Sequence, residues 1–252
     1  MADPKARVRE QFGRQAGAYA RSQTHAADVD LAALIKHLPL TERDRVLDVA
    51  TGTGFTALAI RPRVERVVGL DLTWEMLGEG KRRAGAHAGL DWIQGDVEAL
   101  PFFDQMFSVV TCRRSAHHFS QLDQALSEMV RVLRVGGWLG IVDHANPDGT
   151  AGRQLMEDQE RLRDPSHVRA LTPGEWRAIV EEHRVTVQVA EVHERRVAFD
   201  EWVERAGVDA ERQARLAAAF AQASPLAQEE IGYRGGARPS FVRRWFVLIG
   251  RR

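Results

Sequence analysis

The stretch Arg45-Val46-Leu47-Asp48-Val49-Ala50-Thr51-Gly52-Thr53-Gly54-Phe55 decides the fold of this chain. It starts with apolar residues typical of a buried strand, passes through a glycine-rich turn and leads into a helical segment. Gly52 and Gly54 let the backbone pass close to a ligand, and the first N–H groups of the following helix can bind an anionic group. The stretch therefore predicts a strand–turn–helix unit that holds a ligand.

Two further acids follow predicted strands. Asp71 comes directly after the apolar run 67–70, where a carboxylate can bind ribose hydroxyls. Asp96 follows another predicted strand, and we expect it to accept a hydrogen bond from an adenine amino group. Together these acids predict an adenosine-containing cofactor on a doubly wound α/β fold.

The spacing Gly52-x-Gly54-x-x-Ala57 also fits the dinucleotide-binding pattern. Asp48 favours a different cofactor. Its carboxylate, just before the turn, would repel a pyrophosphate but attract the ammonium group of a methionine moiety.

Strand and helix patterns alternate along most of the chain, which predicts a mostly parallel sheet with helices on both faces. The Gly136-Gly137 pair is expected to end a helix and begin a strand. Strands are predicted at 45–50, 65–70, 91–94, 107–112, 137–143, 185–193 and 240–249. Helices are predicted at 4–20, 26–37, 54–61, 74–86, 121–133, 150–162, 173–182, 199–206 and 209–223.

Four segments in order, 46–54, 68–77, 95–102 and 128–137, carry a family resemblance that covers roughly residues 40–145. The chain resembles the class I S-adenosylmethionine-dependent methyltransferases, closest to the ubiquinone/menaquinone-biosynthesis-type (methyltransferase type 11) small-molecule branch. Ala50 departs from the glycine that many members carry there. The resemblance implies a seven-stranded Rossmann-like sheet whose last strand is antiparallel, a helical cap, and S-adenosyl-L-methionine as cofactor.

The resemblance also implies a single domain in three parts. Residues 1–40 would form helices of a lid, residues 41–146 the cofactor-binding core, and residues 147–252 the cap helices and the last two strands. Tyr19 belongs to a segment that in relatives folds over the methionine end of the cofactor, although its ring could equally pack a helix on the core. Motifs and resemblance together give the expected cofactor-binding set: Tyr19, Asp48, Ala50, Gly52, Gly54, Asp71, Leu72, Met76, Asp96, Val97 and Arg113.

His117 and His118 follow the fourth predicted strand, where they would border the methyl donor. Imidazole titrates near neutral pH, so either could be a general base or hold the substrate, and either could instead fix the loop. Because adjacent side chains usually point in different directions, at most one is expected to be catalytic. His25 is a weaker candidate.

Asp143-His144 could join these histidines in a metal site. The neighbouring Arg113-Arg114 pair disfavours a divalent ion, so no metal is expected, and Asp143 is expected to cap a loop.

Composition is typical of a soluble cytoplasmic enzyme. Lys plus Arg and Asp plus Glu are 35 each, so no basic field suggests nucleic acid or an anionic membrane as partner. The apolar runs 138–142 and 245–249 are too short to span a bilayer, and no leader is evident. Cys112 is the one cysteine, so internal disulfides are excluded. A monomer or homodimer is expected.

The function that these features predict is transfer of a methyl group from S-adenosylmethionine to O or C of a small, aromatic or quinone-like molecule by in-line displacement. One alternative keeps the cofactor but catalyses a cyclisation, decarboxylation or rearrangement. Another is an NAD-dependent oxidoreductase, against which Asp48 and the lack of a Tyr-x-x-x-Lys pair count. A non-catalytic binding protein is the fourth.

Overall fold

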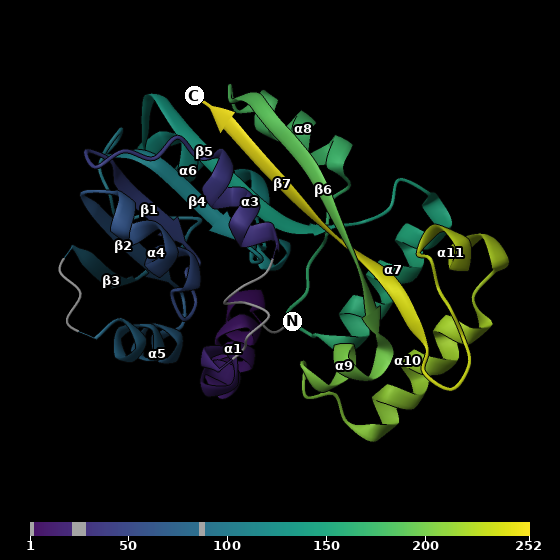
Figure 1. Cartoon of the computed structure of the whole chain (residues 1–252). Coiled ribbons are helices and arrows are strands. Elements are labelled where there is room, and N and C mark those ends of the chain that lie inside the picture. The colour runs from purple at the N-terminus through teal and green to yellow at the C-terminus, as the bar shows by residue number, and fades with distance from the viewer. Residues whose placement is uncertain (1–2, 22–28, 86–88) are drawn as a thin grey trace.

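Seven strands form one sheet in the order β3-β2-β1-β4-β5-β7-β6 (Figure 1). The computed structural model describes residues 3–21, 29–85 and 89–252. Neighbouring strands from β3 to β5 pair in parallel, and β7 pairs antiparallel with both β5 and β6. The strands are β1 (Arg45–Val49), β2 (Arg66–Asp71), β3 (Leu90–Gln94), β4 (Phe107–Arg113), β5 (Leu133–Ala145), β6 (Thr186–Ala198) and β7 (Ser240–Arg251).

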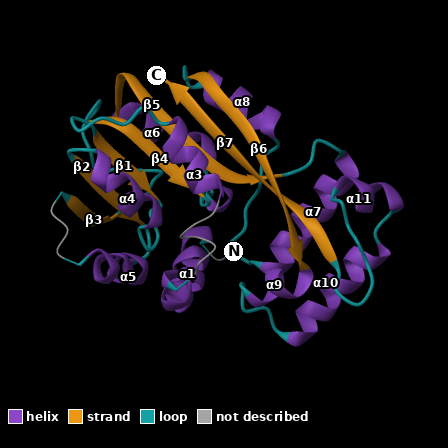
Figure 2. Cartoon of the chain, viewed as in Figure 1, coloured by secondary structure: helices purple, strands orange, loops and turns teal. Residues whose placement is uncertain are grey.

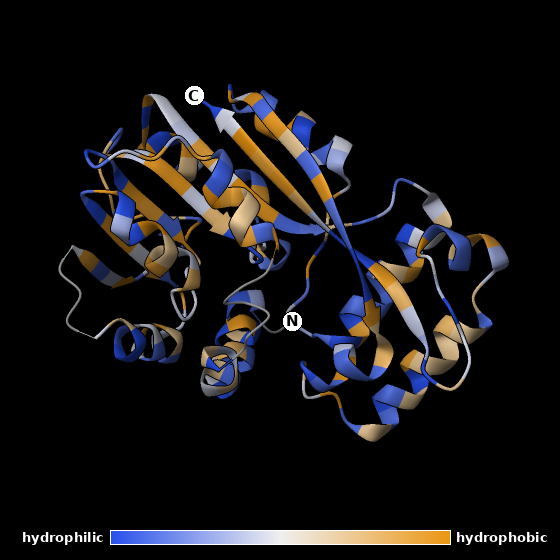
Figure 3. Cartoon of the chain, in the orientation of Figure 1, coloured by the Kyte–Doolittle hydropathy of each residue, from blue (hydrophilic) through white to orange (hydrophobic). Residues whose placement is uncertain are grey.

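Helices cover both faces of this sheet (Figure 2). One core cluster packs α3 (Val29–His37) and α4 (Phe55–Ile60) against one face, with Leu34 and Ile60 fully buried. The other packs α6 (Leu122–Val132) and α8 (Pro173–Glu182) against the opposite face, where Trp176 is 1 % exposed. Apolar residues accordingly concentrate on the central strands (Figure 3). Burying an apolar side chain such as Leu34 or Ile60 contributes roughly 1.5–3 kcal/mol to the free energy of unfolding.

A helical lobe surrounds the ends of β6 and β7 that project beyond the sheet, and Figure 1 shows it beside α1 (Pro4–Ala20). It consists of α7 (Thr150–Arg163), α9 (Phe199–Glu204), α10 (Ala210–Gln222) and α11 (Pro225–Glu230). Its own core includes Trp202, Phe220 and Phe241, whose rings meet edge-on or stacked at 5.0–5.7 Å. The lobe is therefore held by aromatic packing separate from the two sheet cores.

The sheet order places the reversal of connectivity between β1 and β4. Chain connections move outward from β1 to β2 and β3, and in the other direction from β4 to β5. In open α/β sheets, the carboxyl ends of strands at this point leave a crevice for ligands. α5 (Trp74–Ala84) flanks β2 and β3, and α1 packs against α5 at this edge.

The predicted fold class, with its antiparallel last strand, is confirmed. Several boundaries were wrong. β5 begins at Leu133 rather than 137, so the helix ends before the Gly136-Gly137 pair, and β6 continues five residues beyond 193. The short α11 was missed. Part of the helix predicted at 26–37, and His25, lie outside the described residues. Within the described chain no helix is long and apolar enough to cross a membrane.

Candidate active site

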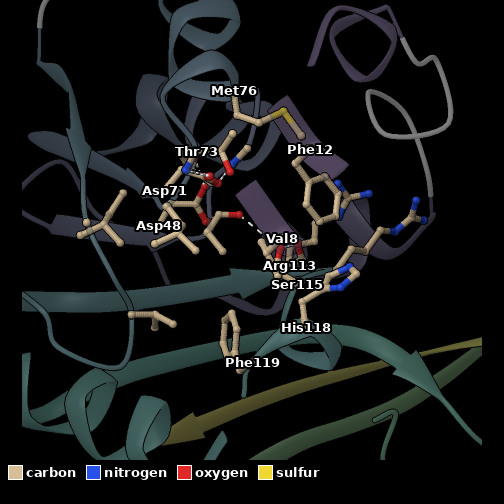
Figure 4. A pocket seen from close by; sticks show the side chains of 18 of the residues that line it. Val8, Phe12, Asp48, Asp71, Thr73, Met76, Arg113, Ser115, His118 and Phe119 are labelled. Atoms are coloured by element: carbon tan, nitrogen blue, oxygen red, sulfur yellow. Dashed lines mark hydrogen bonds between the residues drawn. The ribbon is translucent and has the colours of Figure 1, made fainter. Parts of the chain in front are cut away.

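Two adjoining cavities lie at the carboxyl ends of the central strands. The first, of about 130 Å³, lies between the strand ends and α1 (Figure 4). The second, of about 320 Å³, lies between α1, the ends of β4 and β5, and the lobe. Phe12, Tyr19, Arg114 and His118 line both, so the two cavities meet at these side chains.

Nearly all the expected cofactor-binding residues line the first cavity. These are Tyr19, Asp48, Ala50, Gly52, Asp71, Leu72, Met76, Asp96, Val97 and Arg113. Gly54 is the exception. Its backbone is left-handed, with φ of 80°, and a Cβ atom there would lie 2.2 Å from the Trp92 ring. Gly54 therefore shapes the turn without touching the cavity.

Ala50 occupies an unusual backbone conformation for a residue with a side chain. Its φ is 49°, and Gly52, two residues on, has φ of 55°. The left-handed conformation costs a non-glycine residue about 1–2 kcal/mol. A glycine, which many relatives carry at this position, adopts such a φ without this cost. Ala50 adopts it with the cost in conformational energy given above.

Asp48 is a buried carboxylate at the end of β1. Thr51 Oγ1 donates to it at 2.5 Å and Thr111 Oγ1 at 2.7 Å. Thr111 reaches it because β4 pairs with β1 in that register. Burial raises the pKa of Asp48 to about 6, against the hydrogen bonds of the two threonines, which lower it.

Asp71 ends β2 and faces the same cavity (Figure 4). Its carboxylate accepts the backbone N–H of Gly52 at 2.7 Å and of Thr73 at 2.8 Å. Burial again dominates and raises the pKa of Asp71 to about 6. Within the described ranges neither Asp48 nor Asp71 forms an ion pair, so the cavity holds two acids without a paired cation.

Asp96, the third expected acid, already has partners. Lys5 of α1 lies 2.5 Å from its Oδ2 and 2.6 Å from Oε2 of Glu98, while the Glu98 N–H donates to Oδ1. Lys5 was not expected at the site. Its ammonium group ties the start of α1 to the loop after β3.

Arg113 is paired with Asp30, a contact that the sequence motifs did not predict. Its guanidinium donates to both oxygens of Asp30, at 2.9 and 3.0 Å, and Arg114 binds the same two oxygens at 2.8 and 2.9 Å. Asp30 lies fully buried on α3, and the two arginines hold its pKa below the usual range despite burial. The signal for this contact in the sequence is Asp30 itself, an acid among the apolar residues of the predicted helix.

His117 lines only the second cavity and is paired with Asp143. The Asp143 carboxylate accepts the His117 backbone N–H at 2.8 Å and contacts ring Nδ1 at 2.6 Å. Burial disfavours the imidazolium, but the charge of Asp143 and its hydrogen bond outweigh it and raise the pKa of His117. Asp143 thus holds the loop, as expected, and also orients a histidine, which the sequence did not indicate.

His118 lines both cavities, with its ring edge-on to Phe12 at 4.9 Å. Its Nδ1 lies 3.1 Å from both the carbonyl oxygen and Oγ of Ser166, whose hydroxyl donates to Asp164. Burial and the His117 cation lower the pKa of His118 to about 3. His118 is therefore neutral at pH 7, whereas the pKa of its neighbour His117 is shifted in the opposite direction.

His117, Asp143 and His144 have ligand atoms within 4.8 Å of one another, the geometry of a metal cluster. Arg243 places a guanidinium nitrogen 2.7 Å from Nδ1 of His144, and Asp143 already accepts three N–H contacts, from His117 and from the His144 backbone. A guanidinium at this position opposes a divalent cation. The expectation that no metal is needed remains a prediction.

The comparisons with known proteins agree with this geometry. Residues 46–137 match the methyltransferase domain family. The chain is 34 % identical over 221 residues to an uncharacterized methyltransferase, YcgJ of Bacillus subtilis, covering 86 % of this chain and 87 % of that protein. The YcgJ crystal structure superposes with a TM-score of 0.84 and 32 % identity, covering 88 % of this chain and 97 % of the other.

A quinone-pathway enzyme matches over a shorter region. The ubiquinone/menaquinone biosynthesis C-methyltransferase UbiE of Dinoroseobacter shibae is 45 % identical over 105 residues, which is 39 % of this chain and 42 % of that protein. The fold, the ordered motifs and the near full-length relative lead to one assignment. The chain belongs to the class I S-adenosylmethionine-dependent methyltransferases.

Proposed function

We propose that this enzyme transfers the methyl group to an O or C atom of a small molecule bound in the second cavity, with the cofactor in the first. The observation that carries the proposal is that the two cavities meet at Phe12, Tyr19 and His118. In-line displacement requires donor and acceptor to approach from opposite sides of the methyl carbon. Two adjoining cavities, one for each reactant, fit that requirement.

The residues of the first cavity fit the cofactor by charge. Asp48 and Asp71 are buried with no paired cation among the described residues, and such acids are stabilised by an ammonium group or by hydroxyl donors. We assign Asp48 to the ammonium side of the methionine moiety, Asp71 to the ribose, and Asp96 to the adenine. When bound, S-adenosylmethionine supplies an electrophilic methyl group.

His117 is the better candidate for general base. Asp143 holds Nδ1, which directs Nε2 away from it and toward the second cavity, and it raises the pKa of the ring. A base is most effective when its pKa lies near the working pH. His118, with a pKa of about 3, is a weak base, and we assign it to hydrogen bonding with the acceptor where the cavities meet.

Aromatic side chains support an aromatic or quinone-like acceptor. Phe12, Tyr19 and Trp245 line the second cavity, and such rings favour stacked or edge-on contacts with a planar ligand. UbiE adds nothing on the acceptor, because its match covers only 39 % of this chain.

The experiment that tests the proposal is a product assay. Purified protein is incubated with S-adenosylmethionine and a panel of hydroxyaromatics and hydroquinones, and S-adenosylhomocysteine is measured by mass spectrometry. Methyl transfer predicts S-adenosylhomocysteine and a product 14 Da heavier than the acceptor, about one CH₂ unit. Bound cofactor with a rearranged acceptor and no S-adenosylhomocysteine would favour the non-methylating alternative.

Variants assign the roles. Asp71→Ala should weaken S-adenosylhomocysteine binding, and an affinity equal to wild type would refute the ribose assignment.

His117→Ala should lower turnover by about a hundredfold or more with the cofactor still bound. His118→Ala should mainly raise KM, and full activity in both histidine variants would remove histidine from the mechanism.

A further inference from the structure

Four arginines line the second cavity, although the chain as a whole has no net charge. Arg114 follows β4, Arg163 ends α7, Arg205 follows α9, and Arg243 lies on β7. Two acids, Asp164 and Glu204, line the same cavity. Segments far apart in the sequence thus bring an excess of guanidinium groups to one wall.

Two buried carboxylates near this cavity are each shared between two arginines. Asp30 is shared between Arg114 and the neighbouring Arg113, both within 3.0 Å. Glu160 is likewise shared, at 3.0 Å from Arg163 and 2.8 Å from Arg243. Among the described residues, the single charge of Glu160 therefore serves two cations, Arg163 and Arg243.

Arg205 is the arginine available for a ligand. Its Nε donates to the Glu201 carbonyl at 3.0 Å, and across the described residues no carboxylate lies within ion-pair distance of it. Part of its side chain is exposed at the cavity edge. Burial and the nearby Arg163, Arg195 and Arg114 cations lower the pKa of Arg205, against Glu201, which raises it.

The two acids of the cavity, Asp164 and Glu204, form no ion pair with Arg205 in the described parts of the chain. Asp164 is engaged by Ser166, whose N–H and hydroxyl both donate to its Oδ1, at 2.9 and 2.5 Å. Glu204 is an exposed residue beside Arg205 on the open side, where solvent screens its charge.

We propose that the substrate carries an anionic oxygen group, a carboxylate or a phosphate, which Arg205 binds with Arg163 beside it. This inference rests on the proposed function and adds the substrate class to it. A guanidinium matches either group through two parallel N–H···O bonds. Anchoring the anion at the lobe wall leaves the rest of a planar molecule to reach His117 and His118, so the charge orients the methyl acceptor toward the first cavity.

The test measures binding to wild-type protein saturated with S-adenosylhomocysteine, using isothermal titration calorimetry. The probes are 3,4-dihydroxybenzoate, its neutral partner 3,4-dihydroxybenzamide, phenyl phosphate and inorganic phosphate. At least one anion should bind about tenfold more tightly than the amide, because a charge-assisted hydrogen bond pair is lost with the charge. Whether the carboxylate or the phosphate binds better identifies the group.

Arg205→Gln should remove that preference and Arg205→Glu should reverse it. Arg215→Gln is the matched control, because Arg215 is exposed on α10 and does not line the cavity. If every anion binds no better than the amide, or binds equally to Arg205→Gln, the proposal is wrong. Failure of S-adenosylhomocysteine itself to bind would instead refute the proposed function, so the two failures are distinguishable.

Discussion

Burial of the Asp48 and Asp71 carboxylates lowers the free energy of unfolding at neutral pH. Each carboxylate is buried, each has hydrogen bonds, and neither has a paired cation within the part of the chain that is described. An acid whose pKa is raised to about 6 binds its proton more tightly in the folded than in the unfolded state. The free energy of unfolding therefore falls as pH rises from about 4 to 6, and the loss persists above pH 6.

Replacing Asp48 by Asn should stabilise the protein without ligand. The amide keeps an acceptor for one threonine and has no charge to bury, so the free energy of unfolding at pH 8 should rise by about 1–2 kcal/mol. Urea unfolding at pH 4.5 and pH 8 measures this, and the gain should be larger at the higher pH. S-adenosylhomocysteine binding should weaken.

The control is Asp148→Asn, an exposed acid in the loop after β5. It should change stability little at either pH. If Asp48→Asn destabilises the protein at pH 8, the carboxylate is stabilised by its surroundings and the argument from burial is wrong.

Asp143→Asn tests the base. Turnover should rise with pH through the pKa of His117, because only the neutral ring accepts a proton, and Asp143 raises that pKa. Without the anion, the rising limb should move to lower pH and the plateau should fall by about a hundredfold. S-adenosylhomocysteine affinity serves as the folding control, and a pH profile that does not move would exclude His117 as the titrating base.

The residues of the first cavity could be predicted because their pattern is local. Asp48, Gly52 and Asp71 lie at strand ends within 24 residues of sequence, beside glycines with a clear role. The partners of the second cavity could not. Asp143 with His117, and Glu160 with Arg243, are brought together by the sheet and the lobe, and no spacing in the sequence encodes those contacts.

Among the elements, α1 contributes side chains to both cavities. Phe12 and Tyr19 line each of them, and Gln15 donates to the Ala206 carbonyl of the lobe. Lys5 fastens the other end of the helix to Asp96 and Glu98. The helix thus contacts both the core and the lobe beside the two cavities. That it acts as a lid remains a prediction.

Lys5→Ala should loosen this lid. A partly exposed ion pair contributes about 0.5–1 kcal/mol, so the dissociation rate of S-adenosylhomocysteine should increase about two- to fivefold. Stopped-flow fluorescence measures the rate. Lys81→Ala on α5 removes an exposed lysine outside the cavity and should leave the rate unchanged. A slower dissociation in Lys5→Ala would mean that Lys5 competes for the site instead of closing it.

Elements with clear periodicity were predicted and the others were not. Helix 173–182 matches α8, which begins with Thr172 and Glu175 in a reciprocal capping box. The extension of β6 was missed because its outer residues, such as Glu194 and Arg195, are polar, although they pair with β7. The six-residue α11 is too short to show a period.

At the scale of the whole molecule, the function depends on two packing units. The sheet with its two cores builds the first cavity, and the lobe, held by Trp202 and Phe220, supplies part of the second. The antiparallel direction of the last strand followed from family resemblance rather than from periodicity. The arginine-lined wall followed from neither, because it forms only when the lobe is placed beside β4 and β7.

The measurement that tests the cofactor assignment most directly is the dissociation constant of S-adenosylhomocysteine between pH 5 and pH 7.5. If Asp48 and Asp71 must ionise to bind it, affinity should increase at least about tenfold as pH rises through 6 and then level off. Calorimetry in buffers of different ionisation enthalpy should show protons released on binding at pH 5.5. A dissociation constant independent of pH, or one that rises across this range, would contradict the assignment of the two acids to the cofactor.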